Sequence, residues 1–199
     1  MSVQPQLRAG YIRGVRGVVA QSLLESGLPA APVVRYGIRT AQQVAVETVV
    51  VSGEESVLRG GDRVLVRIKD MDVVVGVNLT FQNARFDACA MELLAGGTLI
   101  TAVIDTILRV NGWEAPTVAQ QATPRYFRLE VYAVNHSVSG GVDGFVQYTF
   151  PYCRATFGNE TLQDQNWVIP ELNIECTESP QGGGAYRKEF ISALPAELV

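Results

Sequence analysis

Phe150-Pro-Tyr-Cys-Arg-Ala-Thr-Phe157 and Val168-Ile-Pro-Glu-Leu-Asn-Ile-Glu-Cys-Thr-Glu178 are the two segments that decide the fold class of this chain. We interpret both segments as β-strands. Gly182-Gly-Gly184 follows as a flexible turn, and Tyr186-Arg-Lys-Glu-Phe-Ile191 continues the β-pattern behind it. Because an unpaired strand edge attracts other chains, this ending indicates a protein that works by assembly and not by catalysis.

The strongest strand patterns lie upstream, in residues 44–58 and 63–82. Residues 44–51 are rich in β-branched side chains, which is typical of strands. Residues 63–69 alternate between two faces. One face carries Val64, Val66 and Ile68, and the other carries Arg63, Leu65, Arg67 and Lys69. Arg59-Gly-Gly-Asp62 predicts a turn that joins the two segments.

The period of the apolar pattern changes at residue 83. Helical spacing connects Phe86, Cys89, Ala90, Leu93 and Leu94. Asp87 is suited to cap the start of a short helix, and Gly96-Gly97 is suited to end it. Residues 98–104 again predict a strand, and we interpret residues 111–124 as a loop.

A hairpin is predicted downstream, because residues 125–134 predict a strand and residues 144–150 pair back across a turn at 136–144. The chain therefore runs through strands, one helix and strands again, which is not the βαβ alternation of a parallel sheet. We predict a mainly β fold: an antiparallel β-sandwich or partly closed barrel with one short flanking α-helix.

Two regions follow from the composition. Residues 1–40 are punctuated by glycine and proline, and residues 18–25 predict a short helix that ends near Gly27. We interpret residues 1–40 as an N-terminal arm or a loosely packed leading segment. Residues 41–199 are expected to form the β-sandwich domain.

Bulk composition sets the class of protein. Of the 199 residues, 47% are hydrophobic and 18% are charged, which allows a sizeable core. No window approaches the ~20 consecutive apolar residues that span a bilayer. The N-terminal sequence lacks the features of a secretory signal, so we expect synthesis in a cytoplasm and no membrane partner.

Charge is distributed unevenly along the chain. The net charge is −4 and the isoelectric point is about 5.1. Arginines cluster in the first third, while acidic residues dominate the end. Binding to duplex DNA by counterion release needs clustered Lys and Arg, and a contact with a neighbouring subunit of complementary charge explains the same asymmetry.

Catalytic signatures are missing. His136 is the only histidine and stands beside a Gly-rich turn. A Ser-His-Asp triad needs a partner serine with an oxyanion loop, and no G-x-S-x-G motif occurs. We therefore interpret His136 as a turn or surface residue, and we expect no enzyme activity and no catalytic residue.

The three cysteines are Cys89, Cys153 and Cys176. Their odd number and the missing CxxC spacing argue against a disulfide framework and against a structural zinc site. We interpret them as small buried hydrophobes. Cys153 and Cys176 lie on neighbouring predicted strands and could be close in space, although nothing requires a bond. No metal or cofactor is expected.

The order of these elements resembles bacteriophage major tail proteins, the subunits of the tail tube. The resemblance rests on Asn78-Leu-Thr-Phe81 followed by Phe86-Asp-Ala-Cys-Ala-Met-Glu-Leu-Leu-Ala-Gly-Gly97. It continues in Phe150 to Gly158, in Trp167 to Glu175 and in Tyr186 to Pro195. It covers residues 60–195 and is one of element order, without a diagnostic motif.

The resemblance implies a structural role. Members of this family form hexameric rings that stack into a hollow tube, with sheets continued between subunits around a lumen through which DNA passes. The implied partners are further copies of the chain and other tail proteins such as sheath, terminator or baseplate. The implied location is the virion tail, after synthesis in the host cytoplasm.

Two groups of residues are predicted to form subunit interfaces. The first is the basic face that contains Arg63 and Arg67, which we expect to contact a neighbouring subunit. The second lies at the C-terminus and is predicted to pair strand edges between subunits: Gly182, Gly183, Gly184, Tyr186, Arg187 and Phe190. An acidic lumen would repel phosphates and let DNA slide.

Other functions stay open. A tail terminator, a tube initiator or another phage connector would form a single ring from a similar chain. A β-sandwich module that binds carbohydrate or another small ligand is the alternative from a different class, with Trp113 and Trp167 as candidate contact residues.

Overall fold

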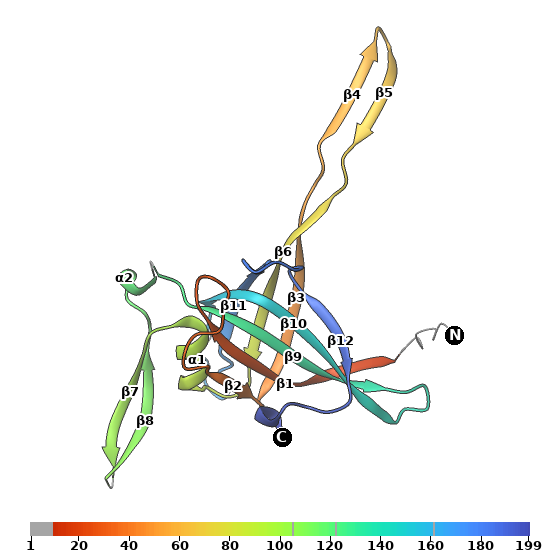
Figure 1. Ribbon diagram of the computed structural model, residues 1–199. Helices are drawn as coiled ribbons and strands as arrows, with labels where there is room; N and C mark the ends of the chain where they lie inside the picture. The colour runs from red at the N-terminus through yellow and green to blue at the C-terminus, as the bar shows by residue number, and fades with distance from the viewer. Residues whose placement is uncertain (1–9, 105, 122, 161) are drawn as a thin grey trace.

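A curved antiparallel sheet forms the body of the molecule, and two hairpins project from opposite sides of it (Figure 1). The computed structural model describes residues 10–104, 106–121, 123–160 and 162–199. The predicted mainly β, antiparallel fold with a short helix is confirmed.

Eight strands make up the main sheet. They are β1 (Tyr11–Leu23), β2 (Arg35–Ile38), β3 (Ala41–Val51), β6 (Val73–Asn83), β9 (Tyr126–His136), β10 (Val142–Phe157), β11 (Glu171–Thr177) and β12 (Arg187–Ile191). Their order is β2-β1-β9-β10-β11-β6-β3, and β12 pairs with the first half of β10. The predicted hairpin is formed by β9 and β10. The C-terminal strands predicted from residues 150–157, 168–178 and 186–191 lie in β10, β11 and β12.

The sheet curls around its own core. β1 and β3 are distant in the strand order but approach each other in space. The concave side is filled by large side chains from most strands, among them Leu79, Phe81, Phe127, Leu129, Phe150 and Ile174. Among the described residues β2 and β3 pair with one neighbour each, so the curved sheet does not close into a barrel.

Helix α1 (Ala88–Ala95) packs into this core through Ala90, Met91 and Leu94. The Asp87 carboxylate accepts hydrogen bonds from the backbone N–H groups of Cys89 and Ala90, at 3.1 and 3.2 Å. Such a cap satisfies amide groups that have no partner in the first turn of a helix. The helix ends at Gly96, whose backbone has a φ of 80°. Glycine adopts such a positive φ readily because it has no Cβ atom. The predicted helix and both of its end signals are confirmed.

Two hairpins lie outside the main sheet. The first joins β4 (Glu55–Gly60) to β5 (Arg63–Lys69), and the second joins β7 (Thr98–Ile104) to β8 (Ile107–Glu114). Short helical turns follow at α2 (Val118–Gln121) and η1 (Ala196–Leu198). The strands predicted at 63–69 and 98–104 are confirmed with the same bounds.

The loop predicted for residues 111–124 is wrong over its first part, because residues 111–114 belong to β8. Thr101 pairs with Val110 and Ile100 pairs with Gly112, so Asn111 is an extra residue at a bulge. An Asn-Gly pair is a frequent turn signal, and here the bulge absorbs it inside a paired strand.

The short helix predicted for residues 18–25 is also wrong. Val18, Val19 and Ala20 lie in β1 and are at most 1% exposed. Val18 and Ala20 pack in the main core on one face of the strand, and Val19 packs with Tyr132 and Leu198 on the other. Within the segment of residues 1–40, β1 is exposed at its start, where Tyr11 is 65% and Ile12 47% exposed, and it is buried only in its middle. β1 and β2 share one sheet with strands from residues 41–199. Residues 1–9 lie outside the described part of the chain.

Candidate assembly surfaces

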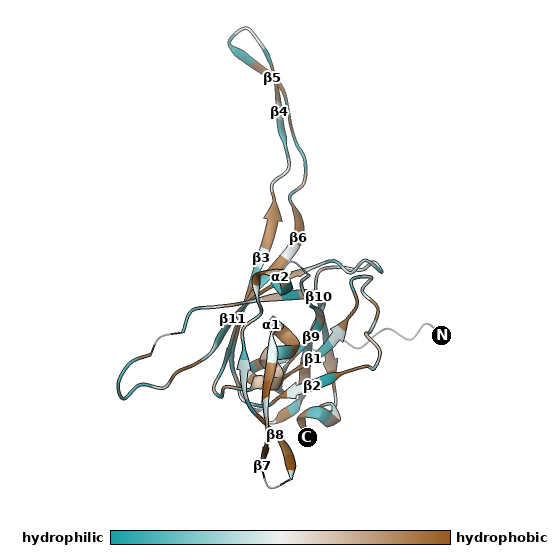
Figure 2. Ribbon diagram, turned by 90° about the vertical axis from the view of Figure 1, so that its left-hand side faces the viewer, coloured by the Kyte–Doolittle hydropathy of each residue, from teal (hydrophilic) through white to brown (hydrophobic). Residues whose placement is uncertain are grey.

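The hairpin of β4 and β5 continues β3 and β6 away from the body, and we call residues 45–75 the long hairpin (Figure 2). No residue of the long hairpin is buried. Many of its exposed side chains are large and apolar: Val46, Val50, Val51, Val57, Leu58, Val64, Leu65, Val66, Ile68, Met71, Val73, Val74 and Val75. An apolar surface this extensive is rare on a protein that works alone.

Strand register gives the outer half of the long hairpin two unlike faces. Ser56 pairs with Ile68 and Leu58 pairs with Val66, which places these four side chains on one apolar face. The pairs Glu55–Lys69 and Val57–Arg67 lie on the opposite, charged face. A two-stranded hairpin is marginally stable alone, and the apolar face of this one is uncovered. It is therefore a candidate docking surface.

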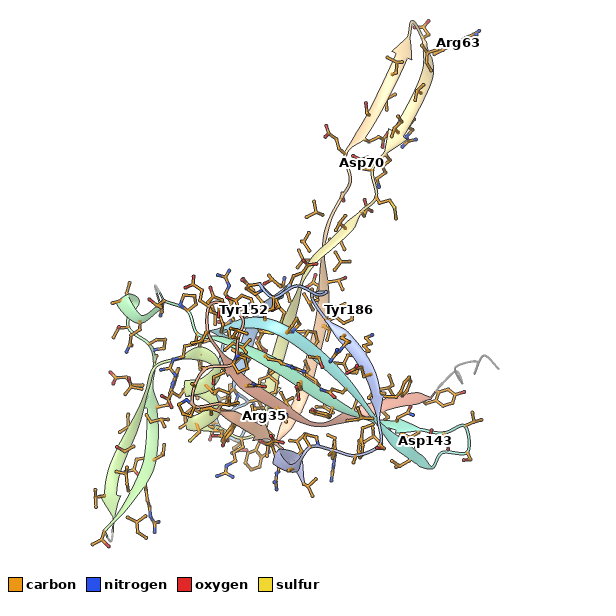
Figure 3. All side chains as sticks on the ribbon, in the orientation of Figure 1. Arg35, Arg63, Asp70, Asp143, Tyr152 and Tyr186 are labelled. Carbon is orange, nitrogen blue, oxygen red and sulfur yellow. The ribbon has the colours of Figure 1, made fainter. Side chains whose placement is uncertain are left out.

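Arg63 and Arg67, predicted as interface residues, both belong to β5. Arg63 lies at the far end of the long hairpin (Figure 3). Arg67 forms an ion pair with Glu55, with Nε and Oε1 2.7 Å apart, and Lys69 pairs with Asp72 at 3.4 Å. The face predicted as basic is therefore balanced by carboxylates of the same hairpin.

β7 and β8 form a second apolar projection, which we call the short hairpin. It points away from the body on the side opposite to the long hairpin (Figures 1 and 2). Its exposed apolar side chains include Ile100, Val103, Ile107, Leu108 and Val110. The sequence signal was present as the β-branched residues of 98–110, but the loop interpretation of residues 111–124 concealed the second half of β8.

The two tryptophans have different surroundings. The ring of Trp113 stacks on Phe157 with centroids 5.7 Å apart, and its Nε1 donates a hydrogen bond of 2.7 Å to the carbonyl of Gly96. Trp113 is therefore a packing anchor. Trp167 is 93% exposed in the loop of residues 158–170 between β10 and β11, together with exposed Leu162.

The three C-terminal glycines lie in a turn before β12. Gly182 and Gly183 have φ values of 88° and 104°, a backbone conformation that residues other than glycine rarely adopt. The N–H of Gly182 donates to the carbonyl of Ser179 at 2.7 Å. Gly184 completes the turn, and the next residue, Ala185, is buried in the core.

β12 carries the remaining predicted interface residues. One of its edges pairs with β10, where Phe190 faces Val146, and among the described strands none pairs with its other edge. Arg187 forms an ion pair with Glu189 at 3.1 Å. The Nζ of Lys188 lies 5.6 Å from the ring centroid of Tyr186, a cation–π distance.

The two predicted groups of interface residues lie apart within one chain. Tyr186 lies on the body, while Arg63 lies at the tip of the long hairpin (Figure 3). β3 offers a further free edge, since β6 is its one partner among the described strands. A groove of about 520 Å³ lies where β1 and β3 approach, lined by Ile12, Val15, Val44, Val46, Tyr148 and Phe150.

His136 ends β9, and its Nδ1 lies 3.3 Å from the carbonyl oxygen of Gly140 in the turn that follows. Within the described ranges, no group of three or more His, Cys, Asp or Glu side chains is placed to hold a metal ion. In the same part of the chain, no helix has the length and apolar character needed to cross a membrane.

Glu130 is the centre of a buried polar cluster. Its carboxylate contacts Arg35 at 3.2 Å and Arg128 at 3.0 Å, and it accepts a hydrogen bond of 2.6 Å from the Tyr132 hydroxyl. Burial, followed by this hydrogen bond, raises the pKa of Tyr132 above its ordinary value. Arg35 also pairs with Glu197 of η1 at 2.9 Å, so the cluster fastens the C-terminus to the sheet.

Comparison with known proteins leaves the class of protein open. The sequence matches no protein-family model and no curated protein. Among solved structures, the chain is similar to one in the "Cryo-EM structure of the anti-feeding prophage (AFP) baseplate, 6-fold symmetrised". The identity is 9%, the TM-score is 0.39, and the match covers 96% of this chain and 100% of that chain. A similarity of this size does not assign a family.

Proposed function

We propose that this chain is a structural subunit of a phage tail tube. Its copies form hexameric rings that stack around a lumen through which DNA passes, and it needs no catalytic site or cofactor for this role. Support comes from the elements that carry the resemblance to tail tube proteins. β6, α1 and Gly96-Gly97 follow one another as the resemblance implies, and so do β10, β11 and β12.

The observation that carries the proposal is the position of the two apolar hairpins. They are unlike in sequence and length, and they project from opposite sides of the body (Figure 1). Contacts between unlike surfaces of identical chains are heterologous, and repeated heterologous contacts generate closed rings or open filaments. A tube of stacked rings combines the two: the contacts within each ring close, and the contacts between rings repeat without closing.

Free strand edges supply the contacts within a ring. The outer edges of β3 and β12 have no partner among the described strands, and such edges pair readily with strands of another chain. Tyr186, Arg187 and Phe190, at or beside β12, are the side chains we assign to these edge contacts. Arg63 and Arg67 lie on β5, and we assign them to a separate contact between the long hairpin and a neighbouring subunit. With a net charge of −4, a lumen lined by carboxylates repels DNA phosphates and keeps the DNA mobile.

The partners of the proposed subunit are further copies of itself and the tail proteins at the tube ends or around the tube, such as terminator, baseplate or sheath. Its location is the virion tail, after synthesis in the host cytoplasm.

Negative-stain electron microscopy of the purified chain at increasing concentration tests the proposal. Hollow tubes of stacked rings are the expected result. Single rings that never stack would identify a terminator, an initiator or another connector instead. Monomers at every concentration and salt condition would contradict the proposal.

A further inference from the structure

Cys153 and Cys176 face each other in the core of the sheet. Cys153 on β10 and Cys176 on β11 are direct partners in the antiparallel register. Their Sγ atoms are in contact at 2.7 Å, and both side chains are 1% exposed. Both are free thiols, and Cys89 lies apart from them on α1.

The backbone geometry suits a covalent bridge between these two residues. Directly opposite residues of antiparallel strands have Cα atoms about 4.5–5.5 Å apart. Disulfides span Cα separations of about 4.4–6.8 Å, so a bridge at this position needs no shift of β10 against β11.

The surroundings protect the thiols in the folded chain. Phe127 on β9 is the partner of Cys153, and Val77 on β6 is the partner of Cys176; both are fully buried. Burial raises the pKa of the Cys153 thiol well above its ordinary value, and the contact with Cys176 adds to this rise. Because the thiolate is the reactive form, exchange is slow unless the strands open.

We propose that Cys153 and Cys176 are a disulfide-forming pair that closes by exchange with a small oxidised disulfide such as oxidised glutathione. One protein thiolate attacks the small disulfide, forms a mixed disulfide and releases one small thiol. The second protein thiolate attacks the protein sulfur of the mixed disulfide and releases the second small thiol. The protein thiols are oxidised and the small disulfide is reduced.

The bridge constrains the loop that connects β10 to β11. It fastens β10 to β11 and closes a covalent loop around residues 154–175, which include the exposed side chains of Leu162 and Trp167. A closed loop reduces the conformational freedom of the unfolded chain. The bridged chain is therefore expected to resist unfolding better than the reduced chain. This inference goes beyond the proposed function and does not depend on it.

A Cys89→Ser variant of the full chain isolates the pair. The variant is unfolded and refolded with a mixture of reduced and oxidised glutathione, or with reduced glutathione alone, and is then treated with iodoacetamide. Trypsin cuts after Arg154 and so places the two cysteines in separate peptides. Prolonged incubation of the folded variant in the same mixtures gives the same readout without refolding.

The expected result in the oxidising mixture is the loss of both alkylation sites and the appearance of the two peptides as one linked species. The bridged chain regains the near-ultraviolet circular dichroism of the reduced folded chain. Two alkylated thiols, glutathione adducts on both residues, or a bridged chain that lacks the native spectrum would overturn the inference. A Cys89→Ser, Cys153→Ala variant is the control and leaves Cys176 alkylated or bound to glutathione.

Discussion

Glu130 shows how this sheet tolerates a buried charge. Two arginines and a tyrosine hydroxyl satisfy its carboxylate, and one of the arginines connects it to Glu197 near the C-terminus. A buried charge that loses a partner remains desolvated without compensation. The cluster is therefore expected to make the fold sensitive to changes at single side chains.

Tyr132→Phe tests this sensitivity and its pH dependence. The lost hydrogen bond to a carboxylate lowers the free energy of unfolding by about 1.5–3 kcal/mol at neutral pH. The pKa of Tyr132 is raised in the folded chain, so its stabilising contribution is present below the unfolded pKa of about 10. It is lost as the pH rises above that value.

Urea unfolding of both chains from about pH 8 to about pH 11 measures the effect across the ordinary tyrosine pKa. The difference in free energy of unfolding between wild type and Tyr132→Phe is expected to shrink as the pH rises. Tyr11→Phe is the control, because this ring is 65% exposed and should give no difference. A Tyr132 effect that stays constant over the range would contradict the assignment.

At the scale of elements, the long hairpin is a strand pair whose apolar side chains lack a covering partner within the described part of the chain. Its residues 45–75 add nothing to the core, whereas the same strands β3 and β6 pack within it nearer the body. The apolar face with Leu58 and Val66 is the part of the hairpin that gains most from burial, by about 1.5–3 kcal/mol for each side chain.

Leu58→Ser with Val66→Ser tests the apolar face of the long hairpin. Assembly measured by light scattering is expected to weaken at least tenfold, since about 1.4 kcal/mol corresponds to a factor of ten. The melting temperature of the unassembled chain stays unchanged, because neither side chain is buried.

Arg63→Gln with Arg67→Gln is the matched change on the charged residues of the same hairpin. It is expected to weaken assembly less, as exposed ion pairs contribute about 0–1 kcal/mol. A larger loss from the arginine variant would make the charged face the main contact.

Elements with local signals were predictable from the sequence. Asp87 and Gly96 mark the ends of α1 by themselves, the two-residue alternation marks β5, and a run of Thr, Ile, Val and Leu marks β7. The burial of β1 was not predictable, because its side chains pack against residues more than a hundred positions away, among them Leu129 and Tyr132. In β5, apolar and polar residues alternate in the same way whether the apolar face packs against the core or against another molecule. For that reason we predicted an interface from the sequence for the basic side chains alone, and the exposure of the apolar face was found only in the structure.

At the scale of the whole molecule, the body has a hydrophobic core of its own and the two hairpins do not. The body buries its aromatic and aliphatic side chains inside the curled sheet. The long and short hairpins leave theirs exposed on opposite sides (Figure 2). Under the proposed function, this division lets a subunit fold before it assembles and leaves the hairpins for a later contact.

The long hairpin can be shortened without disturbing the body. The N–H of Asp70 donates to the carbonyl of Glu54 at 3.0 Å, so the two strands are already paired at this point. An Asn-Gly turn in place of residues 55–69 suits such a position. Because no residue of the removed part is buried, the shortened chain is expected to keep its fold and its melting temperature.

Sedimentation velocity of the wild-type and shortened chains over a range of concentrations tests the central claim, that this is an assembly subunit that polymerises through its long hairpin. The wild type is expected to sediment as multimers whose size grows with concentration. The shortened chain is expected to remain a folded monomer. A wild type that stays at the 21.6 kDa of one chain, or a shortened chain that polymerises equally well, would contradict the account.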